Sequence, residues 1–133
     1  MTDRQLVDLA FQMLERSYVP YSKFPVGAAI YCSDGTVFTG CNVENAAYGS
    51  TICAERTALV KAVSEGHRND FERIAVVGNG IDYCWPCGAC RQMLYEFNPN
   101  LTVLAANGDR EFVSIPLYEL LPQGFGPKSL EQK

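Results

Sequence analysis

The stretches T-I-C-A-E-R-T-A (Thr51–Ala58) and P-C-G-A-C-R (Pro86–Arg91) decide the fold, because each has cysteines where a helix is predicted to begin. Together they supply three thiols and one carboxylate, which are Cys53, Cys87, Cys90 and Glu55. Three sulfurs occupy three corners of a zinc tetrahedron and leave the fourth corner open for water. A carboxylate close to the first sulfur can carry protons to and from that water. The two stretches therefore predict a catalytic zinc centre.

The two helices that carry these residues are predicted over Cys53–Glu65, with Ser50 or Thr51 as the N-cap, and over Cys87–Phe97. A C-x-x-C pair at a helix start puts both sulfurs on the same side, one turn apart, as a metal needs. Exposed amides and the helix dipole at such a start favour a thiolate and an anion. We therefore expect the two helices to lie side by side on one face of a sheet.

The remaining elements follow from hydrophobic periodicity and turn signals. Helices are expected over residues 3–16 and 116–121, and strands over 26–32, 36–42, 73–79, 101–106 and 112–115. The first two strands form a hairpin, because Asp34-Gly35 between them is a strong turn signal. The resulting order, β-β-α-β-α-β-β with further helices at both ends, predicts a mixed sheet flanked by helices, in one domain over 1–133.

Composition limits the classes of partner. The chain has 133 residues, 47% of them hydrophobic and 20% charged, and a net charge of -4. This balance fits a folded domain, and the absence of a Lys/Arg cluster argues against a nucleic-acid partner. No apolar run approaches the roughly 18 residues that span a bilayer. The start M-T-D-R-Q-L-V-D has acids where a signal peptide has basic residues, so we expect a cytoplasmic protein with reduced thiols.

The six cysteines admit other interpretations. A disulfide scaffold is disfavoured without an export signal, and Cys32 and Cys41 are expected to be ordinary core residues. Cys84 could complete a closed structural site of four sulfurs, which would leave Glu55 without a role. The only histidine, His67, lies in the polar loop G-H-R-N-D and is expected to be exposed to solvent and not to bind the metal.

Two arginines follow the cysteine motifs, Arg56 beside Glu55 and Arg91 after Cys90. Three thiolates on Zn²⁺ carry a net charge of -1, which weakens the acidity of a bound water. A guanidinium that donates hydrogen bonds to a ligand sulfur withdraws part of that charge. Either arginine could do so, and we favour Arg56; the alternative for both is a surface ion pair.

Three residues outside the cysteine motifs are candidates for substrate contacts. Phe24 precedes the first strand, where an aromatic ring either packs onto the core or covers a flat ligand. Asn42 and Glu44 are two residues apart in an extended segment, so their side chains point the same way. This arrangement suits a pair of hydrogen bonds to a sugar; the alternative is that both side chains are solvated at the mouth of a loop.

The chain resembles the cytidine deaminases of the small, homotetrameric, three-cysteine type. The resemblance runs over nearly the whole sequence, through Y-S-K-F-P-V-G-A-A, G-C-N-V-E-N-A-A-Y, C-A-E-R-T-A, P-C-G-A-C-R-Q and E-L-L-P-Q-G-F-G. It implies a three-layer α-β-α domain with a five-stranded mixed sheet and one Zn²⁺ per chain. It also implies hydrolytic deamination of cytidine and 2′-deoxycytidine in pyrimidine salvage, in which zinc-bound hydroxide attacks C4 while Glu55 shuttles protons.

The same resemblance implies roles for individual residues. Asn42 and Glu44 would bind the ribose, Phe24 would lie against the pyrimidine, and the backbone of Ala54 would reach the pyrimidine carbonyl. Tyr48 and Phe125 would belong to active sites shared between subunits.

One departure from the family lies at Cys84-Trp85, where many members have a small polar residue before the proline. The resemblance therefore implies nothing about substrate contacts at Cys84 and Trp85. The rival functions are a deaminase for another aminopyrimidine, an editor of DNA or RNA, which the acidic charge disfavours, and a structural zinc module.

Overall fold

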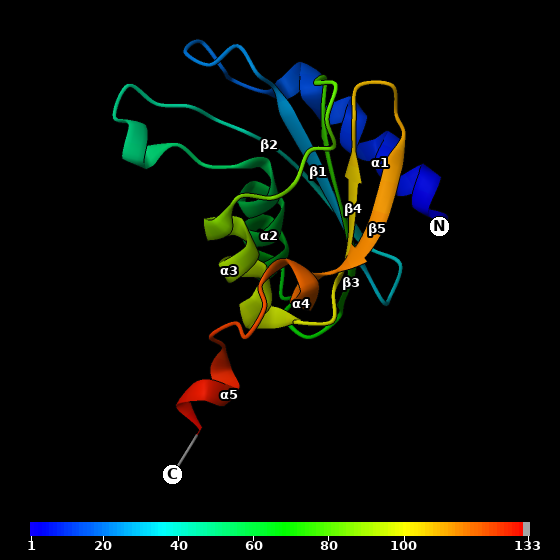
Figure 1. Ribbon diagram of the computed structural model, residues 1–133, viewed down its shortest axis with the longest axis vertical. Helices are drawn as coiled ribbons and strands as arrows, with labels where there is room; N and C mark the ends of the chain where they lie inside the picture. The colour runs from blue at the N-terminus through cyan, green and yellow to red at the C-terminus, as the bar shows by residue number, and fades with distance from the viewer. Residues whose placement is uncertain (132–133) are drawn as a thin grey trace.

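The structure is a computed structural model that describes residues 1–131, so the last two residues of the expected 1–133 domain lie outside the described residues. Its centre is a five-stranded sheet with the order β2-β1-β3-β4-β5 (Figure 1). The strands are β1 (Val26–Cys32), β2 (Val37–Cys41), β3 (Phe71–Gly78), β4 (Thr102–Ala106) and β5 (Phe112–Pro116). Only the β3–β4 pair is parallel, which makes the sheet mixed, as predicted.

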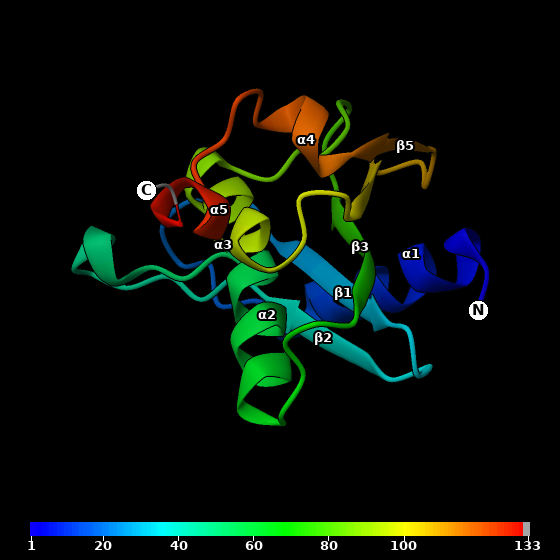
Figure 2. The ribbon, with the colours of Figure 1, turned by 90° about the horizontal axis from the view of Figure 1, so that it is seen from below.

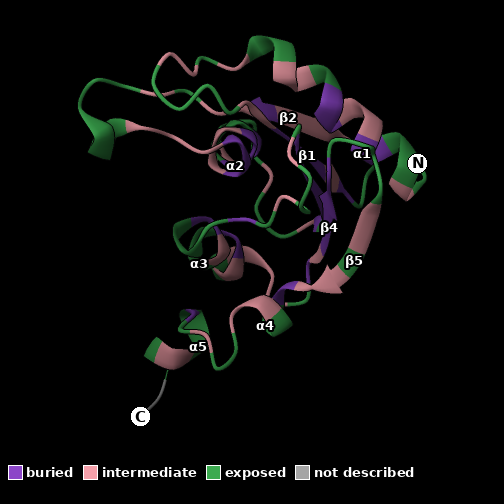
Figure 3. Ribbon diagram, turned by 45° about the horizontal axis from the view of Figure 1, so that its top comes forward, coloured by how far each residue is buried: buried purple, intermediate pink, exposed green. Residues whose placement is uncertain are grey.

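Helices cover both faces of this sheet. Helix α1 (Asp3–Gln12) lies on one face, where Leu6 and Ala10 pack among side chains of β1, β3 and β4. Helices α2 (Ala54–Ser64), α3 (Gly88–Phe97) and α4 (Leu117–Leu120) cover the other face, against the alternate side chains of the same strands. The buried residues concentrate in the strands and in the helix faces that meet them (Figure 3). The three-layer prediction is therefore confirmed.

Helices α2 and α3 lie side by side, and both begin at the same end of the sheet (Figures 1 and 2). Gly40 on β2 lets α2 come close, because a Cβ there would clash with the carbonyl oxygen of Ala54 and lie 2.5 Å from the amide nitrogen of Ala58. A residue without a side chain is needed where two backbones approach this closely. The glycine thus fixes the height of α2 above the sheet.

Several local predictions needed correction. The first helix is capped by Thr2, but its last turn, Met13–Arg16, is a 3₁₀ helix. Helix α2 starts after Cys53, which is itself the N-cap in place of Ser50 or Thr51. The C-terminal tail forms a further short helix, α5 (Pro127–Leu130), which the sequence pattern did not indicate.

The prediction for His67 was wrong. Its side chain is only 18% exposed, hydrogen bonds to Asp70 and packs edge-on against the ring of Phe38.

No helix within residues 1–131 is long and apolar enough to cross a membrane.

Candidate active site

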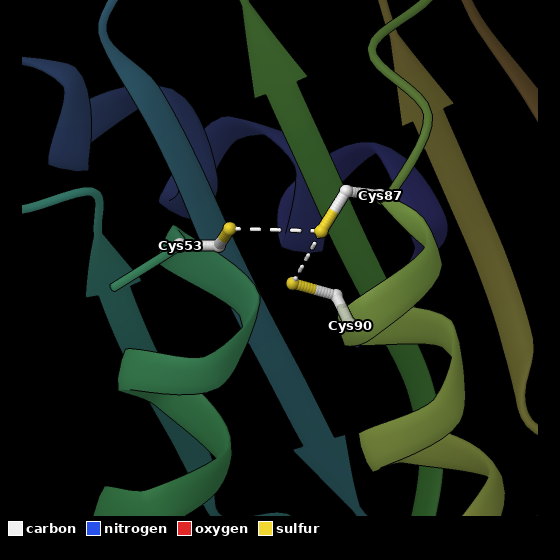
Figure 4. Close-up of side chains that lie close together, drawn as sticks. All are labelled: Cys53, Cys87 and Cys90. Carbon is white, nitrogen blue, oxygen red and sulfur yellow. Dashed lines mark hydrogen bonds between the residues drawn. The ribbon is translucent and has the colours of Figure 1, made fainter. Parts of the chain in front are cut away.

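The starts of α2 and α3 bring three cysteine sulfurs together (Figure 4). The Sγ atom of Cys53 lies 3.7 Å from that of Cys87, which in turn lies 3.4 Å from the Sγ atom of Cys90. Each pair in this group is within 4.8 Å. Cys84 does not join the group among the described residues, so the closed site of four sulfurs is not formed.

The sulfur triangle fits zinc. Tetrahedral zinc with Zn–S bonds of about 2.3 Å needs sulfurs about 3.8 Å apart, close to the 3.7 Å and 3.4 Å separations in the structure. Thiolates are also the donors that favour zinc over magnesium or calcium. Because three protein ligands leave one tetrahedral position, the arrangement is that of a catalytic rather than a structural zinc site.

Two of the three cysteines occupy helix N-cap positions. Cys53 and Cys87 both have extended backbones, with ψ angles of 156° and 168°, and neither side chain makes a capping hydrogen bond. Their sulfurs are therefore free for the metal while the positive ends of two helix dipoles face the cluster. Hydrogen bonds from Cys90, Arg56 and Cys87 lower the pKa of the Cys53 thiol to about 5.

Glu55 lies in the first turn of α2 and is 4% exposed. Burial raises the pKa of this carboxyl group to about 7, and the negative charge of Cys53 adds to the shift. A carboxyl group of this kind can both accept and donate a proton near neutral pH.

The two arginines have different partners. Arg56 places Nη2 3.6 Å from the Sγ atom of Cys53 and 3.3 Å from the carbonyl oxygen of Thr51. Arg91 instead donates to the carbonyl oxygens of Pro86 and Leu120, which ties the start of α3 to α4. Only Arg56 therefore reaches a ligand sulfur.

A cavity of about 230 Å³ opens beside the cluster. The candidate residues on its wall are Phe24, Asn42, Cys53, Ala54, Glu55 and Cys87. Sequence reasoning missed Val26 and Thr51, and Cys84 and Trp85 also face the cavity. The ring of Phe24 lies against Gly78, where a Cβ would be 3.0 Å from the ring. Val26 and Thr51 lie inside the quoted motifs, but valine and threonine are common in strands and loops, so nothing in the sequence marked them as cavity residues.

Asn42 and Glu44 hold the loop that carries Phe24. The Oδ1 atom of Asn42 accepts from the backbone of Val26, and its Nδ2 donates to the carbonyl oxygen of Phe24. The Oε1 atom of Glu44 accepts from the amides of Tyr21 and Ser22. Glu44 lines a second hollow, together with Tyr48 and Thr51, and Thr51 is common to this hollow and the cavity.

Tyr48 and Phe125 are exposed candidates that do not line the cavity. Tyr48 is 75% exposed, at the start of the turn η2 (Tyr48–Ser50), which projects from the body of the molecule (Figures 1 and 2). Phe125 is 56% exposed in the tail, where its carbonyl oxygen accepts from Gln92.

A helix–sheet–helix fold that clusters three cysteine thiols next to a cavity lined by a buried carboxyl group is typical of the zinc-dependent deaminase class. The family model for the cytidine and deoxycytidylate deaminase zinc-binding region matches residues 1–106. The chain belongs to this cytidine deaminase family and is an enzyme of that kind.

Similar proteins match most of the chain. A cytidine deaminase of Halalkalibacterium halodurans is 51% identical over 92% of this chain and 94% of its own length. A cytidine deaminase of Sporosarcina psychrophila is 49% identical over 87% of this chain and 85% of its own length. The crystal structure of cytidine deaminase from Burkholderia pseudomallei superposes with a TM-score of 0.91 at 46% identity, covering 94% of this chain and all of that one.

Proposed function

We propose that the chain catalyses hydrolytic deamination of cytidine and 2′-deoxycytidine to uridine and 2′-deoxyuridine, with release of ammonia, in pyrimidine salvage. The observation that carries this proposal is a buried carboxylate, Glu55, on the wall of the cavity that Cys53 and Cys87, two of the three clustered cysteines, also line. Relatives named cytidine deaminase along nearly the full chain support the choice of substrate.

Cys53, Cys87 and Cys90 would hold one Zn²⁺ per chain, which supplies Lewis acidity that makes water a nucleophile near neutral pH. Glu55 accepts a proton from the attacking water and delivers it to N3 of the pyrimidine, while the water oxygen bonds to C4. Glu55 then takes the second proton of that oxygen and passes it to the amino group. The C4–N bond breaks, ammonia leaves, and the C4 carbonyl forms.

The ribose would be bound by Asn42 and Glu44 in addition to their contacts with the loop. A carboxylate offers about four acceptor sites, and the loop uses two of them, both on Oε1 of Glu44. The amide of Asn42 has one N–H and one lone pair left after its bonds to Phe24 and Val26. Both side chains can therefore reach a hydroxyl group without releasing the loop.

The pyrimidine would lie against the ring of Phe24, with its carbonyl near the backbone of Ala54, since both residues line the cavity. A flat ring against an aromatic side chain is a favourable contact.

We also propose a cytoplasmic homotetramer in which subunits share active sites, with residues 1–133 acting as one domain. Tyr48 and Phe125 are large hydrophobic residues that are 75% and 56% exposed, and a neighbouring subunit would cover them. The hollow beside Tyr48 adjoins the cavity through Thr51, so a partner subunit there would complete the wall. Light scattering of the purified protein tests the assembly, and a monomer at assay concentration would contradict it.

The substitution Glu55→Gln tests the mechanism, because it keeps the shape of the side chain and removes its proton transfer. The rate of cytidine absorbance loss should fall by about 10²- to 10⁴-fold while the zinc content per chain is unchanged. Glu65→Gln, at the exposed far end of the same helix, is the matched control and should retain full activity. Full activity in Glu55→Gln would refute the mechanism. A parallel assay with cytosine shows whether the sugar is required, and one with deoxycytidylate shows whether a 5′-phosphate is accepted.

A further inference from the structure

A second group of metal-binding side chains lies at the opposite end of the sheet from the active site. Cys32 ends β1 and pairs with Phe71 at the start of β3, whereas the other ends of these strands, Val26 and Gly78, adjoin the cavity. Strand β1 has seven residues, so the two ends are separated by roughly 20 Å. The second group is therefore independent of the cysteine triad.

The group consists of Cys32, His67 and Asp70, whose donor atoms all lie within 4.8 Å of one another. The Nδ1 atom of His67 is 2.7 Å from Oδ2 of Asp70. Asp34, on the turn after β1, lies on the other side of the ring, with Oδ2 4.0 Å from Nε2. The edge-on contact with Phe38, at 5.1 Å between ring centroids, fixes the imidazole in this position.

Two features of the group are not accounted for by packing alone. The Oδ1 atom of Asp70 is buried and has no hydrogen-bond partner in the described part of the chain. A buried polar atom without a partner costs free energy, so a ligand for it is expected. In addition, Asp34 and Asp70 share a single ion-pair partner among the described residues, the imidazole of His67. Negative charge is therefore in excess around the buried Cys32.

We propose that Cys32, His67 and Asp70 bind a divalent transition metal, of which Zn²⁺ and Co²⁺ are the natural candidates. Sulfur, imidazole nitrogen and carboxylate oxygen are together a donor set for such ions rather than for Mg²⁺ or Ca²⁺. His67 would bind through Nδ1, and Cys32 would lose its proton on binding. One thiolate and one carboxylate then balance the charge of the ion.

The surroundings supply the other parts of a metal site. Asp34 would accept from Nε2–H of His67, which is the usual partner for a metal-bound imidazole. Its side chain is 55% exposed, so it marks the entry path from solvent. Bonds of about 2.0–2.3 Å place tetrahedral donors roughly 3.3–3.8 Å apart. The 2.7 Å contact between His67 and Asp70 therefore opens by about 0.6 Å as the metal replaces the shared proton.

The simpler alternative is that the His67–Asp70 hydrogen bond only fastens the loop before β3. Under that alternative Cys32 is a core residue with no ligand to bind. The two readings differ in whether a thiolate at position 32 takes part, and cobalt reports this directly through sulfur-to-cobalt charge-transfer absorption.

The experiment is a Co²⁺ titration, under reducing conditions, of enzyme loaded with one Zn²⁺ per chain, with zinc content and deaminase activity followed throughout. We expect about one Co²⁺ per chain, with a charge-transfer band, while zinc and activity are retained. Cys32→Ser should lose the band and His67→Gln should weaken Co²⁺ binding at least 10-fold. The control Cys41→Ser should behave like wild type, because this half-buried cysteine belongs to neither group of metal-binding side chains and its sulfur hydrogen bonds to the carbonyl oxygen of Arg16.

Three outcomes would overturn the proposal. The first is no charge-transfer band in the wild-type protein, and the second is an unchanged band in both Cys32→Ser and His67→Gln. The third is a band that grows only as zinc and activity are lost, which would place cobalt at the cysteine triad. If Cys32→Ser does not fold, Asp70→Asn replaces it, since this change preserves size and should also weaken binding.

Discussion

Replacing Gly40 by alanine is expected to damage the metal centre from a distance. A Cβ at this position would lie 2.5 Å from the amide nitrogen of Ala58, and ordinary contacts begin at about 3.4 Å. Helix α2 must therefore move away from β2 by about 0.9 Å, the difference between these two distances. Overpacking of this kind costs about 1–3 kcal/mol of folding free energy.

The movement also changes the site, because α2 carries Cys53 and Glu55 while Cys87 and Cys90 belong to α3. A metal site tolerates errors of about 0.2 Å in its bonds, and misplacement of reacting groups by 1 Å can cost about 10²-fold in rate. We expect Gly40→Ala to release zinc to a chelator faster than wild type and to lose about 10²-fold in kcat/KM for cytidine.

The matched control is Gly49→Ala, because a Cβ at Gly49 would meet nothing within 4 Å. Chelator competition, thermal unfolding and the cytidine assay are run on both variants. If Gly40→Ala folds with wild-type zinc retention and activity, the close approach of β2 to α2 does not position the ligands, and the reasoning is refuted.

Three further substitutions separate the parts of the site. Arg56→Gln removes the guanidinium from Cys53 and should lower kcat or zinc affinity about 10- to 100-fold. Steady-state kinetics and metal analysis measure both quantities, and unchanged values would assign Arg56 to packing. Cys84→Ser should keep the zinc count of wild type, and loss of the metal would restore the closed site of four sulfurs. Gly78→Ala puts a Cβ 3.0 Å from the ring of Phe24, so KM for cytidine should rise several-fold with zinc retained; an unchanged KM would place the pyrimidine elsewhere.

The sheet and its two covering layers were predictable from sequence because their signals are local. Alternating and helical hydrophobic patterns, with Asp34-Gly35 as a turn, are enough to order the elements. The predicted helices began at Cys53 and Cys87, whereas in the structure these two cysteines are the N-caps. The known N-cap preferences apply to side chains that hydrogen bond to the backbone. Cys53 and Cys87 make no such bond, so no propensity scale identifies them as caps.

The details that the sequence did not reveal depend on contacts between distant segments. His67 was expected in solvent from its polar loop, but Phe38, far earlier in the chain, covers its ring. Asn42 and Glu44 were expected to face a ligand, and in the structure they also satisfy backbone groups of the loop around Phe24. Each backbone amide of a loop needs a partner, and nothing in the loop sequence shows where that partner comes from.

The N-cap positions of Cys53 and Cys87 also change the balance of charge at the metal centre. Three thiolates on Zn²⁺ carry a net charge of -1, and Arg56, favoured over Arg91, was expected from the sequence to offset part of it. Each helix N-terminus contributes roughly +0.5 of an elementary charge, and two of them converge on the sulfurs. The two helix ends together therefore offset about as much negative charge as one arginine. Arg56 adds to a field that the fold already provides, so its removal should weaken the centre without abolishing it.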